Sequence, residues 1–439
     1  MNDLTQGNIS KQFIFLSLPL IMGDFLQQLY NMLDSLIAGW RISENAFTAI
    51  GVAGSIMNLF IFIINGSCHG ITILFSQFYG QKDYEKVQKE TFVSLVFGFI
   101  LCFVLSFVGI VFLKPILNLL NTPQLVYMDV YNYLRIINLF LAVTFFYNWS
   151  SSVLRAFGDS KAALYSLIIS VVVNVILDLA FVTYWHRGVE SLAYATIIAQ
   201  GISSVCCVLY LLKKYPFILF HKKQLKDLKN MFLRTIKYGL VSALHQSSLF
   251  IGKLLIQSAI NMCSISVVTA YAITTRIETL INSFGNSGSI AISILVGQNY
   301  GAGKKERIRD SLWIGGKIMA LVCAVGCVCM VLACKPLTGL FVSLDHTRVV
   351  HETWIYIFVV ALFYEFCFIG YAFVGYFKGL GWVNIPVIGT TMHVILRVIL
   401  SILFVQKYGL LAVGLATGIG WACLNVYQVF VYRRKQIEI

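Results

Sequence analysis

The chain has 439 residues, of which 58% are hydrophobic and only 12% are charged. Ordinary soluble domains carry about 25% charged residues, and a soluble core holding this much apolar sequence would need polar surface that the chain lacks. These values exclude a soluble enzyme and a secreted disulfide-bonded scaffold. They predict an integral membrane protein, because one span takes about 20 apolar residues and the chain has room for many.

Basic residues exceed acidic ones, with 33 Lys and Arg against 19 Asp and Glu and a net charge of +14. The basic residues cluster between apolar runs, at 82–89, 213–237, 304–309 and 433–435. This placement is typical of loops on the cytoplasmic side of a membrane. We therefore expect the lipid bilayer, and not nucleic acid, as the partner of these charges.

Twelve apolar runs follow one another along the chain, bounded by charged residues or by Gly, Pro and Asn. Lipid requires each span to satisfy its own backbone hydrogen bonds, so we expect helices. The first six runs lie at about 13–40, 48–78, 91–113, 127–150, 161–185 and 190–212. A basic connection at 213–237 follows, and the last six runs lie at about 238–262, 266–298, 311–334, 353–377, 384–406 and 409–432. The sequence thus predicts an all-α polytopic membrane protein with twelve transmembrane helices.

The charge distribution predicts how the chain is oriented. With both termini in the cytoplasm, the inside segments hold 23 of the 33 Lys and Arg residues, the outside loops hold six and the spans hold four. This is the excess that the positive-inside rule describes. We expect a multi-pass protein of the cell's inner (plasma) membrane that acts as a monomer.

The two halves of the chain resemble each other at an offset of 221 to 223 residues. The matched segments are Tyr79-Gly80 with Tyr300-Gly301, Ala195-Thr196 with Ala416-Thr417, and Arg155–Asp159 with Lys378–Trp382. Because each half has six runs, both halves enter the membrane from the same side and the repeat is parallel. We expect an N-terminal lobe at 1–215, a basic cytoplasmic linker at 216–237 and a C-terminal lobe at 238–439. Two such lobes with a substrate held between them are a recurrent transporter plan.

Polar and ionisable residues inside the first six runs are functional candidates, because they are costly in a bilayer. On a helix, one sector about 120° wide of the first run holds Asp24, Gln27, Gln28, Asn31 and Asp34. Asn174 and Asp178 lie four apart in the fifth run and share one helix face, and Thr196 adds a hydroxyl in the sixth. Such oxygens suit a hard cation, and a buried carboxylate can hold a proton instead. The competing interpretation of the first run is a polar stripe that only joins helices.

The second half does not duplicate this set. Arg397 and Ser401 stand where the offset of 223 would place the Asn and Asp of the fifth run, and Lys253, Glu278 and Glu365 supply the other charges. A structural role is as plausible for these residues as a transport role. No HExxH, GxSxG or P-loop pattern occurs in the sequence, so we expect neither an enzyme nor a bound cofactor.

Three segments carry a resemblance to a known family. Leu18-Pro19-Leu20 with Asp34 in the first run, Leu154–Ser160 after the fourth and Val296–Gly303 after the eighth resemble the multidrug and toxic compound extrusion (MATE) family. The resemblance implies an antiporter that rocks between inward and outward states and expels organic cations in exchange for Na⁺ or H⁺. The cation site of the family's prokaryotic members implies that Asp34, Asn174, Asp178 and Thr196 bind the coupling ion here. Some members have a further acidic site in the second lobe, for which Glu278 and Glu365 are candidates.

We expect the substrates to be small organic cations, attracted by the acidic first run and by aromatic rings that offer cation–π contacts. The candidate residues of the substrate cavity are Asp24, Gln28, Asn31, Tyr147, Glu278 and Glu365. One alternative is a lipid-linked oligosaccharide flippase of the same superfamily, which requires a cationic cavity; Lys253, Arg276 and Arg397 favour it and the acidic first half opposes it. A channel or receptor is an alternative of another class, opposed by the two-lobe repeat.

Overall fold

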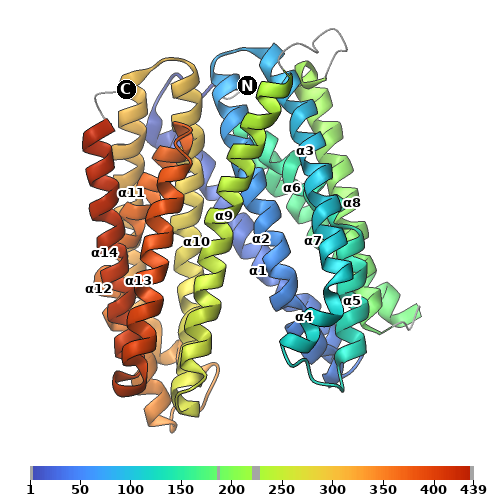
Figure 1. Ribbon diagram of the computed structural model, residues 1–439, viewed down its shortest axis with the longest axis vertical. Helices are drawn as coiled ribbons and strands as arrows, with labels where there is room; N and C mark the ends of the chain where they lie inside the picture. Colours follow the sequence, from blue (N-terminus) through green and yellow to red (C-terminus); the bar gives the residue numbers. More distant parts are fainter. Residues whose placement is uncertain (1–2, 185–187, 220–227, 436–439) are drawn as a thin grey trace. The chain divides into compact units, whose positions relative to one another are not determined.

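The computed structural model describes residues 3–184, 188–219 and 228–435. These residues form fourteen α-helices and one short 3-10 helix (Figure 1). Eleven of the helices are long and apolar enough to cross a membrane, and a bent helix pair raises the number to twelve if it is counted as one span. The predicted all-α architecture with about twelve spans is therefore confirmed.

The helices of the first half cover the first six predicted spans. Their bounds are α1 Ile9–Arg41, α2 Glu44–Gly80, α3 Tyr84–Val111, α4 Leu113–Leu119, α5 Tyr127–Leu139, α6 Leu141–Ala156, α7 Ser160–Tyr184 and α8 Val189–Lys214, followed by the 3-10 helix η1 Pro216–Ile218. The fourth predicted span is broken, since α5 and α6 meet at an angle of 54°. The short helix α4 was not predicted, because its seven residues are too few to show a period.

The helices of the second half cover the other six predicted spans. Their bounds are α9 Leu228–Ile260, α10 Ile265–Gly301, α11 Lys305–Gly339, α12 Thr347–Gly379, α13 Asn384–Tyr408 and α14 Leu410–Lys435. The predicted start of the seventh span at residue 238 is wrong by about three turns, because α9 already begins at Leu228. The early turns carry basic residues, and part of the predicted basic connection, 220–227, lies outside the described residues.

The chain divides into two compact units. The first unit contains Pro19–Ala243, and the second contains Asp3–Leu18 together with Leu244–Ile439. In the second unit α12 packs against α10, α11 and α14, and α14 packs against α13 (Figure 1). In the first unit α6 packs against α2 and α8, and α8 packs against α7.

Helices α1 and α9 each contribute to both units, and a glutamine at corresponding positions of the two halves contacts the chain near the start of each helix. In the second unit, Oε1 of Gln298 accepts a hydrogen bond from the backbone N–H of Leu4 (3.3 Å), and Arg307 donates to the carbonyl oxygen of Leu4 (3.0 Å). In the first unit, Oε1 of Gln77 accepts one from Arg234 at the start of α9 (2.9 Å). Gln77 and Gln298 are 221 residues apart, which is the offset of the predicted repeat.

Backbone turns recur at the same offset. Six residues with positive φ form three pairs 221 or 223 residues apart, all in connections between helices. The pairs are Lys82 (57°) with Gly303 (68°), Gly158 (78°) with Gly381 (83°), and Gly188 (59°) with Gly409 (58°). Glycine adopts this left-handed conformation without steric cost, which accounts for its presence at five of the six positions. The two halves therefore follow the same backbone course, as the parallel repeat predicted.

Candidate functional site

The four residues predicted to bind a coupling ion come together in the first unit. Asp34 of α1, Asn174 and Asp178 of α7, and Thr196 of α8 are all buried, with 0–7% of each residue exposed. With its amide turned to satisfy its hydrogen bonds, the nitrogen of Asn174 donates to Oδ1 of Asp34 (2.9 Å) and to Oδ2 of Asp178 (3.1 Å). One amide thus joins the carboxylates of two helices.

Two tyrosines complete this cluster. The hydroxyl of Tyr30, one turn before Asp34 on α1, donates to Oγ1 of Thr196 (3.0 Å). Tyr133 on α5 lies near the same group of residues. Both tyrosines are buried. The cluster therefore contains four helices, two carboxylates, one amide and three hydroxyl groups.

The charge of the cluster is unbalanced. The shared Asn174 amide holds the carboxyl groups of Asp34 and Asp178 close together, and Oδ1 of Asp178 has no hydrogen-bond partner among the described residues. No lysine, arginine or histidine in the described part of the chain lies within 4.0 Å of either carboxylate. Two buried carboxylates without a counter-charge are costly in a membrane. The arrangement can share a proton or hold a hard monovalent cation between its oxygens.

Small side chains bring the helices of the cluster together. The hydroxyl of Ser203 on α8 donates to the carbonyl oxygen of Ser166 on α7, and the thiol of Cys207 donates to the Ser166 hydroxyl at 2.9 Å. At Gly23 of α1, an added Cβ would lie 3.6 Å from Leu167 of α7, so these two helices are in contact there. The close packing of α1, α7 and α8 places their oxygen atoms at one point.

The other polar residues of the first run do not share one environment. Asp34 is buried and Asp24 is half-buried, whereas Gln28 and Asn31 are exposed. Tyr147 is half-buried on α6. The polar sector of the first helix is therefore only partly buried within the unit.

In the second unit, Glu278 of α10 lies at the centre of another buried polar cluster. Its Oε2 accepts a hydrogen bond from Tyr356 (3.1 Å) and its Oε1 accepts one from Tyr364 (3.4 Å), both on α12. Asn282 donates to the Tyr364 hydroxyl (3.2 Å), and Arg397 of α13 donates to the Tyr356 hydroxyl (3.4 Å). The two tyrosines thus hold Glu278 in place.

Glu365 and Arg276 lie outside that cluster. Although Glu365 follows Tyr364 directly, it is half-buried and forms no hydrogen bond with the tyrosines that contact Glu278. Arg276 is exposed, and its guanidinium lies 5.4 Å from the ring centre of Phe341. Glu278 and Glu365 are therefore separate groups, and Arg276 does not pair with Glu278, as their spacing of two residues on a helix predicted.

Sequence reasoning missed the tyrosines at both clusters. Tyr133, Tyr356 and Tyr364 are neutral and aromatic, and the chain contains 22 tyrosines. The sequence feature that could have indicated these residues is a tyrosine in the middle of an apolar run, because its hydroxyl group needs a hydrogen-bond partner when it is buried. That signal does not say which of the 22 lies beside a carboxylate.

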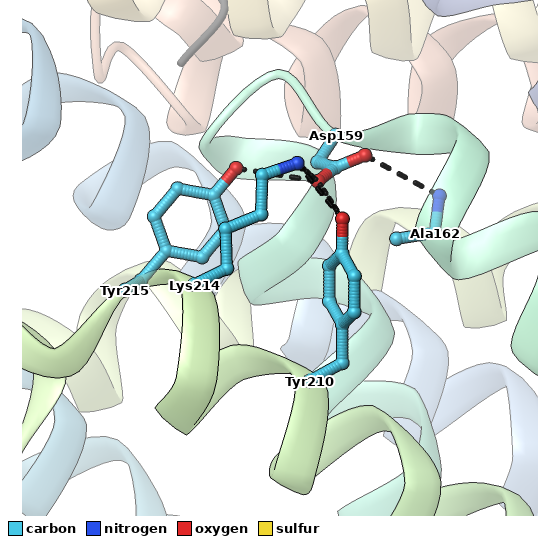
Figure 2. Close-up of polar contacts among 5 residues, drawn as sticks. All are labelled: Asp159, Ala162, Tyr210, Lys214 and Tyr215. Carbon is cyan, nitrogen blue, oxygen red and sulfur yellow. Dashed lines mark hydrogen bonds and ion pairs between the residues drawn. The ribbon is translucent and has the colours of Figure 1, made fainter.

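A third polar cluster joins the loop before α7 to the end of α8 (Figure 2). Oδ2 of Asp159 accepts hydrogen bonds from Lys214 (2.5 Å), Tyr210 (3.0 Å) and Tyr215 (3.3 Å), while Oδ1 accepts one from the backbone N–H of Ala162 (3.4 Å). Burial and the adjacent Asp159 carboxylate raise the pKa of the Tyr215 hydroxyl, which keeps it a donor. The second unit has an equivalent contact, since Lys435 at the end of α14 lies 4.7 Å from the ring centre of Trp382 before α13.

No group of three or more His, Cys, Asp or Glu side chains suited to a metal ion occurs in the part of the chain that the structure describes. The Asp34 cluster combines two carboxylates with neutral oxygen donors, so its chemistry differs from that of a zinc or iron site. All eleven cysteines are free.

A family model described as MatE matches the chain twice, at residues 19–180 and 241–403. The probable multidrug resistance protein YpnP of Bacillus subtilis (strain 168) is 26% identical over 434 residues, which cover 98% of this chain and 96% of that protein. The multidrug export protein MepA of Staphylococcus haemolyticus (strain JCSC1435) is 23% identical over 424 residues, covering 95% and 91%. The two family-model matches coincide with the two halves of the repeat.

Solved structures show the same fold. A multidrug resistance MATE family transporter of the MOP superfamily, in an outward-facing conformation, superposes with a TM-score of 0.91 at 20% identity, covering 99% of this chain and 97% of that one. A MOP superfamily transporter from Pyrococcus furiosus, described with a reverse polarity of its binding pocket, gives a TM-score of 0.90 at 19% identity, covering 98% and 97%. The chain therefore belongs to the MatE family of multi-pass membrane transporters, whose members are not enzymes.

Proposed function

We propose that this transporter is a secondary active antiporter that exports organic cations in exchange for Na⁺ or H⁺ by alternating access. The relatives named as multidrug resistance and multidrug export proteins support the export of diverse small molecules. The observation that carries the proposal is the pair of buried carboxylates, Asp34 and Asp178, which share one amide and have no cationic partner among the described residues.

The coupling ion occupies this carboxylate pair in our proposal. Asp34 and Asp178 supply charged oxygens, and Thr196 supplies a hydroxyl oxygen. Rotation of the Asn174 amide by half a turn exchanges the positions of its nitrogen and its oxygen. In one orientation the nitrogen bridges the two carboxylates in the absence of an ion, and in the other the oxygen can ligate a bound ion. A proton on one of the two carboxyl groups has a similar effect. It removes one negative charge, and the protonated carboxyl group can donate a hydrogen bond to the other carboxylate.

Coupling requires that the ion bind the inward and outward states with different affinities. Asp34 lies on α1, and this helix contributes its first turns to one unit and the rest to the other. A change in the bond between Asp34 and Asn174 therefore acts on a helix that is continuous with both units. The proposal also includes the organisation of the chain: two lobes at 1–215 and 238–439 joined by a linker at 216–237. We propose further that both termini are cytoplasmic and that the protein acts as a monomer in the plasma membrane.

Substrate binding is assigned to polar and aromatic residues of the two lobes. In this proposal Asp24, Tyr147 and Glu365, which are half-buried, attract and contact the cationic substrate, together with the exposed Gln28 and Asn31 of α1. The buried Glu278 contributes negative charge from within its unit. Aromatic rings add cation–π contacts, which become stronger where water is excluded.

Export of a fluorescent cationic dye from proteoliposomes tests the proposal, with Na⁺ and H⁺ gradients applied separately. Asp178→Asn keeps the size of the side chain and removes its charge, so Na⁺ binding and gradient-driven export should both fall. Asp345→Asn is the control, because Asp345 is exposed in the turn before α12. Wild-type transport by Asp178→Asn under both gradients would show that the first unit does not hold the coupling site.

A further inference from the structure

The polar cluster of the second unit contains more positive than negative side chains. Lys253 of α9 lies beside this cluster, because the adjacent Gly252 packs against Val394 of α13, three residues before Arg397. The charges of Glu278 and Arg397 both act on Lys253. Neither cation forms an ion pair within 4.0 Å in the described part of the chain. Two cationic side chains from α9 and α13 therefore accompany one carboxylate from α10, which is the reverse of the charge balance in the cluster of the first unit.

Arg397 uses few of its hydrogen-bond donors. A guanidinium has five N–H groups, and the hydrogen bond described for Arg397 is a long one, 3.4 Å, to the Tyr356 hydroxyl. Its Nε atom is buried and has no hydrogen-bond partner among the described residues. A buried donor without an acceptor is costly, so the Arg397 guanidinium is short of acceptor oxygens.

The carboxylate already present does not meet this need. Both oxygens of Glu278 accept hydrogen bonds from tyrosines, and Tyr356 stands between Glu278 and Arg397. Lys253 is exposed, so protein atoms do not cover the cluster on the side of this residue. A carboxylate or phosphate group has two oxygens that match the planar guanidinium fork, and a lysine adds a point charge. A cationic group would be repelled by both side chains.

We propose that Lys253 and Arg397 form an anion site in the second unit, which binds a carboxylate or phosphate group of the transported molecule. This inference rests on the proposed export function and refines its substrate class, because a molecule bound there carries an acidic group in addition to its cationic one. Glu278 and Tyr356 are positioning residues that orient the Arg397 guanidinium. The preferred substrates are then zwitterions.

Two dyes with the same cationic chromophore test the site. Rhodamine 110 carries a free carboxylate, and rhodamine 123 is its methyl ester. Fluorescence anisotropy with purified full-length protein in neutral detergent measures the binding of each. We expect Lys253→Gln and Arg397→Gln to weaken the binding of rhodamine 110 by about tenfold or more and to leave that of rhodamine 123 within about twofold. Arg276→Gln is the matched control, because Arg276 is a third intramembrane cation whose contact is the Phe341 ring.

Equal losses for both dyes, or no loss for either, would overturn the anion site. Arg397→Lys guards against misfolding of the Arg397→Gln variant, since it keeps the charge and should recover part of the carboxylate preference. The same measurement in nanodiscs of phosphatidylcholine, with and without phosphatidic acid, identifies the source of the anion. Displacement of rhodamine 110 by phosphatidic acid supports a site for a lipid phosphate, and its absence supports a site for a soluble carboxylate.

The experiments give different results when the export proposal fails and when the anion site fails. If no dye is exported under either gradient while Lys253→Gln still weakens the binding of rhodamine 110 selectively, the anion site stands and the proposed function does not. If both dyes are exported and every variant treats them alike, the exporter stands and the anion site is refuted.

Discussion

The crossing of α2 and α9 in the first unit depends on the absence of a side chain at Gly66. A Cβ atom at this position would lie 2.6 Å from Cα of Ala243 and 2.8 Å from the carbonyl oxygen of Ser242. Both neighbours are backbone atoms, so no rotamer change relieves the contact. Gly66→Ala therefore forces the two helices apart by about 0.8 Å to reach an ordinary contact of roughly 3.4 Å, at a cost of about 1–3 kcal/mol.

A second glycine of the same helix provides the control. Gly54 has no atom within 4 Å of the position of an added Cβ. Alanine is favoured over glycine in a helix by about 1 kcal/mol, and this gain applies to both substitutions. The difference in unfolding free energy between Gly66→Ala and Gly54→Ala thus isolates the clash, and we expect it to be about 1–3 kcal/mol.

Thermal unfolding of the detergent-purified protein, followed by fluorescence-detected size-exclusion chromatography, measures this difference. We expect Gly54→Ala to unfold at or above the wild-type temperature and Gly66→Ala to unfold roughly 2–6 °C below Gly54→Ala. Equal unfolding temperatures for the two variants would refute the reasoning, because they would mean that the close backbone contact does not limit how α2 and α9 pack.

Three further predictions concern polar contacts. Asp159→Asn should lower the unfolding free energy by about 2 kcal/mol, because three donors converge on one buried oxygen of Asp159. Glu85→Gln is the control: it breaks the ion pair of the exposed Glu85 and should cost less than about 1 kcal/mol. Thermal unfolding of the two variants measures the difference. Arg307→Gln should speed amide hydrogen exchange in the N-terminal segment, whose carbonyl groups Arg307 binds, and unchanged exchange would contradict that anchoring role. Asn174→Ala should weaken Na⁺ binding less than Asp178→Asn does, because it removes a neutral group; radioactive Na⁺ binding that falls more for Asn174→Ala would oppose the proposed roles.

The sequence predicts the fold well and the site in part. The lengths of the apolar runs are enough to predict the number of spans, because a helix must have a minimum length to cross the bilayer. The spacing of Asn174 and Asp178 predicts that they share a face, whereas the position of Asp34 beside them depends on how separate helices pack. The hydroxyl partner Tyr133 could not be found, since nothing local distinguishes it from other tyrosines. The early start of α9 at Leu228 was missed because its first turns are basic and are held by contacts with distant residues such as Gln77.

The membership of α1 and α9 in both units bears on the origin of the molecule. Asp3–Leu18 completes the core of the second unit, and the first turns of α9, up to Ala243, complete that of the first. A homodimer of six-helix chains that exchange their first segments has this same organisation, and fusion of two duplicated genes would make the exchange intramolecular. Each half of the present chain then lacks a segment of its own core. Halves separated between Ile218 and Leu228 should be unstable when expressed singly and should assemble when expressed together.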